Sequence, residues 1–433
     1  MKDTLVALNE SILQDYLQQV KQKSLFSRTV VGLHEQQDWA VRQGALSHQS
    51  GGFFHVVGAK RRTNPQEEYL MLYQPQGAVT GLILCKTAEE PMVLLQARVE
   101  PGNSYIVQYG PTIQSTAANY LRMHGGKATS LSEYFLSHHP QAQLITHSMQ
   151  QDLGKRYFQK SKTHHYIEVP ELLPTPDCMI WVPLSVLRGA ISTSNFLNAD
   201  LRSLLSVFDW DAWLGHTAAL ELHTVWQPLP VPVHGVSAVS PYRMCGLHEL
   251  QQWEVSEAGV LPRQPHRPGV QFFSFASTTR EVTQWVQPLM TVQGVGLVQQ
   301  LIRRTDSGVE WLLRLSKEAG TSTAFVYDAS YTRYPEETTD DNAAFDAGKV
   351  TYSMVQCDEG GRFMENDTQY DIREVSAAWN DIEPTHCWVP TRLLKTLLAG
   401  SNMCSFQLRN VASMLLAELC PNTFGGNKKA TEP

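Results

Sequence analysis

The stretch Leu33-His-Glu-x-Gln37-x-Trp39-x-Val41 decides how the chain is organised, because Leu247-His-Glu-x-Gln251-x-Trp253-x-Val255 repeats it at identical spacing. Further pairs follow in the same order in both halves: Phe53-Phe54 with Phe272-Phe273, Glu100-x-Gly102 with Glu318-x-Gly320, Gly154-x-Arg156 with Gly360-x-Arg362, Trp181-Val-Pro183 with Trp388-Val-Pro390, and Leu201-Arg202 with Leu408-Arg409. A period of roughly 210 residues is the size of a domain and too long for a solenoid repeat. The sequence therefore predicts a tandem duplication in which each copy buries its own core.

The repeat also sets the expected domain boundaries. We expect an N-terminal helix within residues 1–30, a first domain over 31–225, a connector over 226–246, a second domain over 247–420 and a disordered tail over 421–433. Closely spaced prolines suit an extended connector. The tail has two adjacent glycines and no hydrophobic periodicity, which is typical of a disordered terminus.

Local patterns predict strands followed by helices in each copy. Asn9 can cap a helix over the following apolar face, and runs rich in Val, Leu and Ile predict strands at 79–85, 92–97 and 295–302. Further helices are expected after a capping box at Ser130-x-x-Glu133, from Leu184, from Asn198, and over Thr391 to Ala399 with Gly400 as the stop. This order favours an α+β class, with mixed sheets and flanking helices, over a doubly wound sheet.

Composition excludes several classes of protein. Of the 433 residues, 42% are hydrophobic and 18% charged, which is globular, and the net charge of −7 argues against a nucleic-acid binder. Seven cysteines without a C-x-x-C pair are typical of reduced thiols in a cytoplasmic protein. The chain shows no signal-peptide pattern and no run of eighteen apolar residues, so we expect neither secretion nor a membrane span.

Several catalytic motifs are absent. There is no G-x-S-x-G elbow, no phosphate-binding loop ending in Gly-Lys-Ser or Gly-Lys-Thr, and no G-x-G-x-x-G fingerprint. Adjacent histidines at 138–139 and 164–165 lack the spacing of a zinc helix, and the acidic pair at 340–341 is typical of a solvated loop. The sequence predicts no metal and no bound cofactor.

A polar stretch over residues 96–126 contrasts with these negatives. It alternates glutamines, asparagines, a glutamate, arginines and a histidine with apolar residues, glycines and prolines. Such alternation holds polar side chains on strands that face a cleft. The plain alternative is a solvated connection between two strands.

This stretch resembles the signature of the NDP-hexose 2,3-dehydratases of deoxysugar pathways. The matching residues are Gln96-Ala-x-Val-Glu-Pro-Gly-Asn103, Pro111-Thr-x-Gln-x-Thr116, Asn119-Tyr-x-Arg122, His124-x-Gly126, and in the second copy Trp285-Val-Gln-Pro-Leu289 and Asp358-Glu-Gly-Gly-Arg-Phe363. The resemblance implies two Nudix-like domains, a homodimer, and loss of water across C2 and C3 of a dTDP-linked 4-keto-6-deoxyhexose. It implies no redox cofactor, and a 3-ketoreductase that consumes the labile diketo product.

Proton transfer during such a dehydration needs an acid, a base and a donor to the enolate oxygen. Within the stretch we expect these roles from His124, Glu100 and Tyr120. Glu318 repeats Glu100 in the other copy, so both can equally be residues that fix a shared turn. Nudix hydrolysis is disfavoured, because neither copy has the clustered Arg-Glu-x-x-x-Glu-Glu box.

Binding roles are expected for polar side chains of both copies. Arginines pair with phosphate oxygens bidentately, and amides read sugar hydroxyls and the base edge. The expected substrate-binding residues are Gln96, Asn103, Gln108, Thr112, Gln114, Asn119, Arg122, Arg156, Glu359 and Arg362.

Two departures keep other functions open. The segments Gln151-Asp-Leu-Gly154 and Lys162-Thr-His-His-Tyr166 differ from the usual family pattern, at positions expected to touch the ligand. The second copy has Arg314, Thr321 and Ser330 in place of Gln96, Asn103 and Thr112, so it is expected to differ chemically. The alternatives are a non-catalytic nucleotide-sugar-binding protein and a sugar-nucleotide lyase or isomerase of another regiochemistry.

Overall fold

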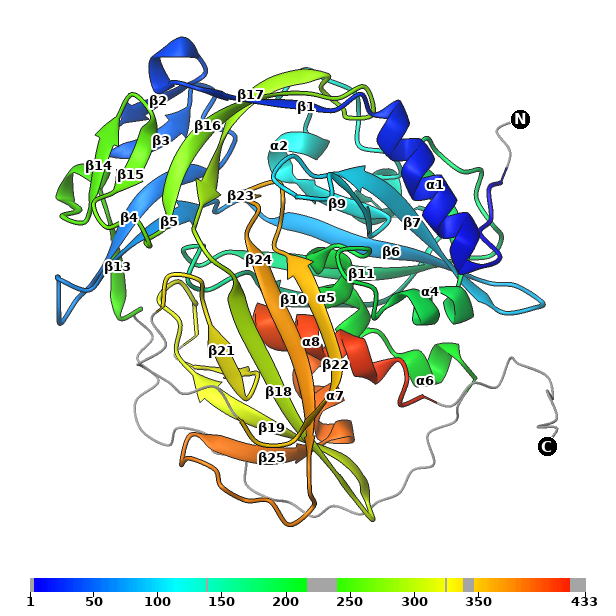
Figure 1. Cartoon of the computed structure of the whole chain (residues 1–433). Coiled ribbons are helices and arrows are strands. Elements are labelled where there is room, and N and C mark those ends of the chain that lie inside the picture. Colours follow the sequence, from blue (N-terminus) through cyan, green and yellow to red (C-terminus); the bar gives the residue numbers. More distant parts are fainter. Residues whose placement is uncertain (1–3, 138, 216–239, 324, 338–345, 421–433) are drawn as a thin grey trace.

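The chain is a mixed α+β protein built from four β-sheets and short helices, as the computed structural model shows (Figure 1). The structure describes residues 4–137, 139–215, 240–323, 325–337 and 346–420. We call residues 4–215 the first half and residues 240–420 the second half. Of the connector expected over 226–246, residues 226–239 lie outside the described residues, as does the expected tail over 421–433. Residues Tyr242–Cys245 of that connector form a strand, β13.

Each half contains a seven-stranded sheet, and the two sheets have the same strand order. The first runs β10-β11-β6-β7-β12 with β8 on β7 and β9 on β6, and the second runs β22-β24-β18-β19-β25 with β20 on β19 and β21 on β18. Each sheet has one parallel pair of strands at its centre, β6 with β11 in the first and β18 with β24 in the second. Lys162 pairs with Ala78 in the first, and Thr368 pairs with Gly296 in the second. Lys162 and Thr368 therefore occupy equivalent positions.

The strands of the first large sheet are β6 (Ala78–Lys86), β7 (Pro91–Val99), β8 (Val107–Gly110), β9 (Ile113–Thr116), β10 (Gln143–Gln151), β11 (Ser161–Val169) and β12 (Met179–Pro183). Those of the second are β18 (Gly296–Thr305), β19 (Gly308–Ser316), β20 (Val326–Asp328), β21 (Tyr331–Arg333), β22 (Lys349–Cys357), β24 (Asp367–Val375) and β25 (His386–Pro390). The strands expected at 79–85, 92–97 and 295–302 are confirmed as β6, β7 and β18.

Two smaller sheets exchange a strand between the halves. A five-stranded sheet contains β2 (Trp39–Arg42), β3 (Ala45–His48), β4 (His55–Arg61), β5 (Glu68–Tyr73) and β13 (Tyr242–Cys245). A six-stranded sheet contains β1 (Ser27–Val31), β14 (Trp253–Ser256), β15 (Gly259–Pro262), β16 (Gly269–Ala276), β17 (Gln284–Thr291) and β23 (Phe363–Met364). Strand β1 of the first half thus pairs with β16 of the second, and β13 of the second pairs with β4 of the first.

The repeated Leu-His-Glu segments follow the exchanged strands. They form the short 3-10 helices η1 (Leu33–Glu35) and η2 (Leu247–Glu249). The backbone amide of Leu33 donates to Glu257 across the halves, and that of Leu247 donates to Gly44. The motif that marks the repeat in the sequence therefore fixes the exchange in the structure.

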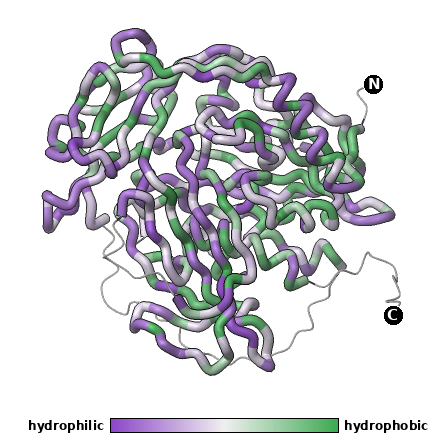
Figure 2. Tube along the Cα trace, viewed as in Figure 1, coloured by the Kyte–Doolittle hydropathy of each residue, from purple (hydrophilic) through white to green (hydrophobic). Residues whose placement is uncertain are grey.

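The helices are α1 (Glu10–Lys23), α2 (Ala117–Tyr120), α3 (Glu133–Leu136), α4 (Leu184–Ala190), α5 (Ala199–Val207), α6 (Trp210–Trp213), α7 (Thr391–Ala399) and α8 (Phe406–Leu416). Helices α5 and α8 lie between the two large sheets (Figure 1), and Arg409 donates from α8 to Ser203 of α5 at 2.7 Å. Apolar residues gather in the central strands and in the helices packed on them, whereas the peripheral turns are hydrophilic (Figure 2). None of the described helices is long and apolar enough to cross a membrane.

Most expected helices are confirmed, and one start is wrong. Asn9 caps α1 by accepting from Ile12, Asn198 caps α5 by accepting from Leu201, and α7 ends at Gly400. The capping box at Ser130 does not form, because α3 begins only at Glu133 and Ser132 precedes it without a side-chain cap. Leu131 there has a φ of 58°, which a helix cannot include.

Candidate functional site

A cavity of about 370 Å³ lies between the two halves. Its aromatic wall, here called the aromatic recess, consists of Trp39, His48, Phe53 and Phe54 of the first half and Trp285 of the second. The Trp39 and Phe54 ring centroids lie 5.0 Å apart, and the Trp39 indole donates to the backbone oxygen of Val286 at 3.1 Å. The small sheets place these rings, since Trp39 begins β2, His48 ends β3 and Trp285 lies in β17.

A narrower space of about 60 Å³ continues the recess inward. Apart from Arg280 and Arg362, its charged side chains are Arg98, Glu100, Lys162, Asp200 and Glu359, and we call these five the charged floor. Both spaces are lined by Asn119, Arg280, Gln287 and Arg362, so they adjoin each other along these side chains, and we call the two together the cleft. The Arg362 guanidinium lies 4.5 Å from the centroid of the Phe54 ring, at the junction of the recess and the floor.

Lys162 is the centre of the floor. From β11, its ammonium contacts both Asp200 oxygens at 2.8 and 3.0 Å and Glu359 Oε2 at 3.0 Å. It also lies 3.1 Å from Asp152 Oδ2, and the adjacent Lys160 ammonium lies 3.2 Å from that same oxygen. Two lysines and three carboxylates are therefore buried together at one end of the cleft.

Local structure explains the position of Asp200. Because the Asn198 side chain accepts from Leu201 at 2.9 Å, helix α5 begins at Ala199 and carries Asp200 in its first turn. The start of a helix favours a negative charge. Lys162, the second residue of β11, contacts Asp200 in this turn, and Glu359 reaches Lys162 from the loop that follows β22.

Burial and neighbouring charges shift the pKa values of Asp200 and Glu359 in opposite directions. Burial raises the pKa of Asp200 to about 6, against the attraction of Lys162. Burial would also raise the pKa of Glu359, but Lys160, Lys162 and Arg362 outweigh it and hold that pKa well below its usual value. Three carboxylates likewise outweigh burial at Lys162 and raise its pKa well above normal. Asp200 is thus the member of this set whose charge changes near neutral pH.

Glu100 lies in the floor with both oxygens engaged. One accepts from the backbone amide of Gly360 at 2.9 Å, and the other accepts from Asn198 at 2.9 Å and from Gln114 at 3.3 Å. The side chain is 2% exposed. Its geometry is that of a residue that ties the second half to the first and orients Gln114.

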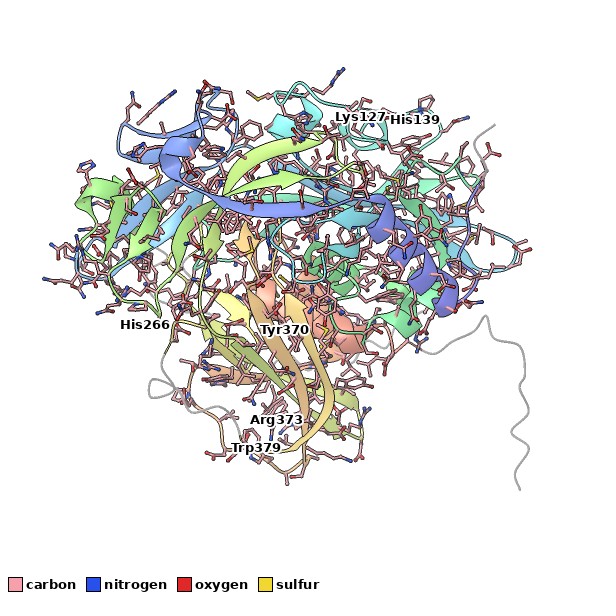
Figure 3. All side chains as sticks on the ribbon, turned by 45° about the horizontal axis from the view of Figure 1, so that its top comes forward. Lys127, His139, His266, Tyr370, Arg373 and Trp379 are labelled. Atoms are coloured by element: carbon pink, nitrogen blue, oxygen red, sulfur yellow. The ribbon has the colours of Figure 1, made fainter. Side chains whose placement is uncertain are left out.

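The other expected residues, in helix α2 and in the loop that follows it, differ in whether they line the cleft. Asn119 and His124 line the recess; His124 Nδ1 accepts from Gly126 at 2.8 Å, and burial lowers its pKa. Tyr120 is half-buried and lines neither the recess nor the floor. Arg122 is exposed and donates to the backbone oxygen of Gly126. Figure 3 shows Lys127, just beyond this loop, at the opposite end of the molecule from Trp379.

Four further expected residues lie away from the cleft. Gln96 and Thr112 line a separate cavity of about 150 Å³ on the other side of Arg280. Gln108 is fully buried and donates to Asn195 at 2.8 Å, and Asn103 accepts from the amide of Tyr105 within a turn. These positions give Gln108 and Asn103 roles in local structure.

Arg156 and Arg362 occupy equivalent turns but have different partners. Arg156 is buried and donates to both oxygens of Glu336 at 2.6 and 2.7 Å, outside the cleft. Arg362 has no ion pair among the described residues, and its guanidinium lines the cleft. The first arginine is thus neutralised within the protein, whereas the second faces the cavity.

Sequence reasoning missed several cleft residues. Lys162 is expected only as part of a segment that touches the ligand, and Trp39 and Trp285 stand in motifs but receive no role. Asp200 has no local motif. A comparison of the two halves is the signal that could have found it, because the equivalent residue of the second half, directly before Leu408-Arg409, is the neutral Gln407.

Comparison with known proteins gives the same family over both halves. The family model described as NDP-hexose 2,3-dehydratase matches residues 10–208 and 238–415. Three similar proteins are named dTDP-4-dehydro-6-deoxy-alpha-D-glucopyranose 2,3-dehydratase. The one from Saccharopolyspora spinosa is 24% identical over 86% of this chain and 83% of its own length. The one from Amycolatopsis orientalis has the same identity and coverage, and the one from Streptomyces violaceoruber is 23% identical over 88% and 90%.

Among solved structures, a crystal structure of an ADP compounds hydrolase matches with 13% identity and a TM-score of 0.27, over 39% of this chain and 95% of that one. A score at that level does not establish a shared fold. The family model, in contrast, covers most of the chain, including the segments that form the recess and the floor. The chain belongs to the NDP-hexose 2,3-dehydratase family.

Proposed function

We propose that the chain removes water across C2 and C3 of dTDP-4-keto-6-deoxyglucose to give the 3,4-diketo-2,6-dideoxy sugar. The observation that carries the proposal is the order of groups along one cleft: aromatic rings, then arginines, then a charged floor. A nucleotide sugar has its parts in the corresponding order, namely base, diphosphate and hexose. The names of the three relatives support the same substrate.

The aromatic recess suits the nucleobase. Its rings come from both halves, and stacking of a base on aromatic side chains contributes about 1–3 kcal/mol per base. His124 and Asn119 add polar atoms at the rim of the recess, where they can accept from or donate to the base or ribose. We therefore assign both residues to nucleotide binding, and His124 is not needed for proton transfer at the sugar.

Arg362 suits the diphosphate. It lines both parts of the cleft, and guanidinium groups bind phosphate oxygens in a bidentate manner. Arg156 supports this assignment from within the molecule, because at the equivalent turn it binds the two oxygens of Glu336. The Glu336 carboxylate occupies the anion position beside Arg156. Arg362 has no carboxylate partner among the described residues, so its guanidinium is available to a phosphate. Arg280, which lines the same junction and has its Nε 3.5 Å from Glu281 Oε2, adds a second guanidinium group.

The floor suits the hexose. Removal of the hydrogen on C3 is helped by the neighbouring ketone, and positive donors stabilise the resulting enolate. Gln114 and Asn119 reach the sugar hydroxyls, and Glu100 holds Gln114 in place. The expected acid or base role of Tyr120 receives no support from its position outside the cleft.

We also propose the finer features that the resemblance implies. The equal strand order of the two large sheets supports a tandem duplication, and a Nudix-like fold of each half is part of the same proposal. A homodimer, a cytoplasmic location and a downstream 3-ketoreductase complete it. Sedimentation of the purified chain tests the dimer, because a monomer at micromolar concentration would contradict it.

The activity is tested by incubating the chain with dTDP-4-keto-6-deoxyglucose, a 3-ketoreductase and NADPH. The expected result is the dTDP-2,6-dideoxy sugar, identified by mass spectrometry and NMR. A control without the chain fixes the background. Tight binding of the substrate without turnover would contradict the proposal and favour a nucleotide-sugar-binding protein.

A further inference from the structure

We infer that Asp200 is the catalytic residue that takes the proton from C3 of the sugar and returns it to the departing C2 hydroxyl, with Lys162 as its positioning residue. The inference rests on the proposed function and names the proton-transfer group of that site. It is carried by the juxtaposition of Asp200, Lys162 and Glu359 on the floor of the cleft.

The first step of the argument is geometric. Asp200 lines the cleft from the first turn of α5, and Lys162 holds both of its oxygens at 2.8 and 3.0 Å. A single ammonium that contacts both oxygens fixes the orientation of the carboxylate at the edge of the space. Lys162 itself contacts four carboxylate oxygens and has no proton left to donate to a ligand.

The second step compares the two halves. At the positions equivalent to Lys160, Lys162 and Asp200 of the first half, the second half has Asn366, Thr368 and Gln407. Glu359 is contributed by the second half, and its equivalent in the first half is Leu153. The neutral residues of the second half stand on a sheet of the same strand order and beside a helix of the same kind. The fold therefore does not require the charges, and they occur where the cleft is.

The third step eliminates the other carboxylates. Glu100 accepts three hydrogen bonds that fix a turn, and Asp152 lies behind the two lysines with no exposed side-chain surface. Glu359 is held by Lys162 and by the Tyr157 hydroxyl, and its depressed pKa keeps it ionised. Asp200 remains, and its pKa near neutrality is that of a group able to both accept and release a proton.

The proposed reaction balances with this one carboxyl group. The Asp200 carboxylate takes the proton from C3, and the electron pair of the C3–H bond forms an enolate with the C4 carbonyl oxygen. As the enolate collapses, the C2–O bond breaks, and the leaving hydroxyl takes the proton from Asp200 and departs as water. The enol at C3 then becomes a ketone by gaining a proton at C2 and losing one at oxygen.

The Asp200→Asn variant tests the assignment, with Gln407→Asn at the equivalent position as its matched control. Asn should fold, since a neutral amide already stands at position 407. General acid–base groups contribute roughly 10²–10⁴ in rate, so kcat should fall by that factor, while dTDP binding stays within three-fold. Exchange of the C3 hydrogen in D2O, followed by NMR, should vanish as well, and Gln407→Asn should keep both activities.

A second readout concerns Lys162. The groups that face Asp200 are Lys162 on β11, Asp152 after β10, Glu359 after β22 and Arg409 on α8. Because Lys162 favours the ionised form, Lys162→Gln should move the acid limb of the kcat/KM profile to higher pH, which a merely structural role would not do.

Three results would overturn the inference. The first is a folded Asp200→Asn variant with kcat within ten-fold of the wild type. The second is C3 exchange at the wild-type rate in that variant, which would move the base elsewhere while leaving the proposed function intact. The third is a wild-type chain that neither dehydrates nor exchanges the substrate, which would overturn the proposed function together with the inference.

Discussion

Gly102→Ala should loosen the contact between the halves by about 2–6 kcal/mol. A Cβ at Gly102 would stand 1.8 Å from the backbone oxygen of Phe363 and 2.8 Å from that of Gly360, so one turn must move. The movement breaks two bonds, from the Gly102 amide to Gly360 (2.6 Å) and from the Glu365 amide to Gly102 (2.7 Å). Each buried bond left unmade costs about 1–3 kcal/mol, which gives the range above.

The molecule offers a matched control for this change. Gly320→Ala would place a Cβ 1.8 Å from the backbone oxygen of Tyr157, and it breaks the bond from Gly320 to Gly154 and the one from Gln159 to Gly320, each 2.6 Å long. Both variants should therefore lose similar stability, roughly 2–7 °C in Tm, because 1 kcal/mol shifts Tm by about 1 °C in a chain of 433 residues. Only Gly102→Ala also disturbs Glu100, because that side chain accepts from Gly360.

Thermal unfolding followed by circular dichroism measures the first effect, and kcat/KM at 15 °C, where both variants are folded, measures the second. We expect equal losses in Tm and a fall in kcat/KM, by at least ten-fold, in Gly102→Ala alone. A Tm within 2 °C of the wild type for Gly102→Ala would refute the packing argument. Equal losses of kcat/KM would refute the link between the turn and the floor.

Three further changes test other parts of the molecule. Arg362→Met should raise the Kd for dTDP at least ten-fold in calorimetry, whereas Arg156→Met should leave the Kd unchanged and lower Tm, because Arg156 is bound by Glu336. Trp285→Ala should weaken binding of dTDP by about 1–3 kcal/mol, and an unchanged Kd would place the base elsewhere. Burial and the nearby Asp328 raise the pKa of Glu318 to about 7, so its stabilising protonation is complete below about pH 4.5 and is lost as pH rises through 7. Glu318→Gln should therefore raise Tm relative to the wild type at pH 8, with the difference shrinking toward pH 5 in denaturation scans.

Much of the local fold could be predicted, because it depends on residues close in sequence. The cap at Asn9 and the stop at Gly400 act through neighbouring backbone groups, and both are confirmed. The exchange of β1 and β13 could not be foreseen, since nothing in a strand sequence states which sheet edge it will pair with. The false start at Ser130 has a similar origin: the sequence fits a capping box, but turns over 129–132 use the backbone differently.

The candidate site was predictable only in part, for a related reason. The stretch 96–126 does reach the cleft through Glu100, Gln114, Asn119 and His124, yet alternate residues of its strands point into the core. Gln108 is one of these, since β8 packs it against Asn195. The opposite wall comes from residues distant in sequence, and no spacing rule connects such positions before the halves are placed together.

The energetics of the floor give the strongest reason to regard it as functional. Taking an ion out of water costs several kcal/mol even in a relaxed protein, and a mutual attraction of buried partners often only offsets that penalty. The protein nevertheless buries together Lys160, Lys162, Asp152 and Asp200 of the first half and Glu359 of the second, which leave one net negative charge. At the position of Asp152 the second half keeps Asp358 without lysine partners, and burial raises the pKa of Asp358 to about 7, so that it can be neutral. The two large sheets thus have the same strand order with charged residues in one and neutral residues at the equivalent positions of the other. Folding of the sheet therefore does not require the charges. The two lysines and Asp200 are present only in the first half, and Glu359 reaches them from the second at the cleft, where fixed charges can act on a bound sugar without reorganising.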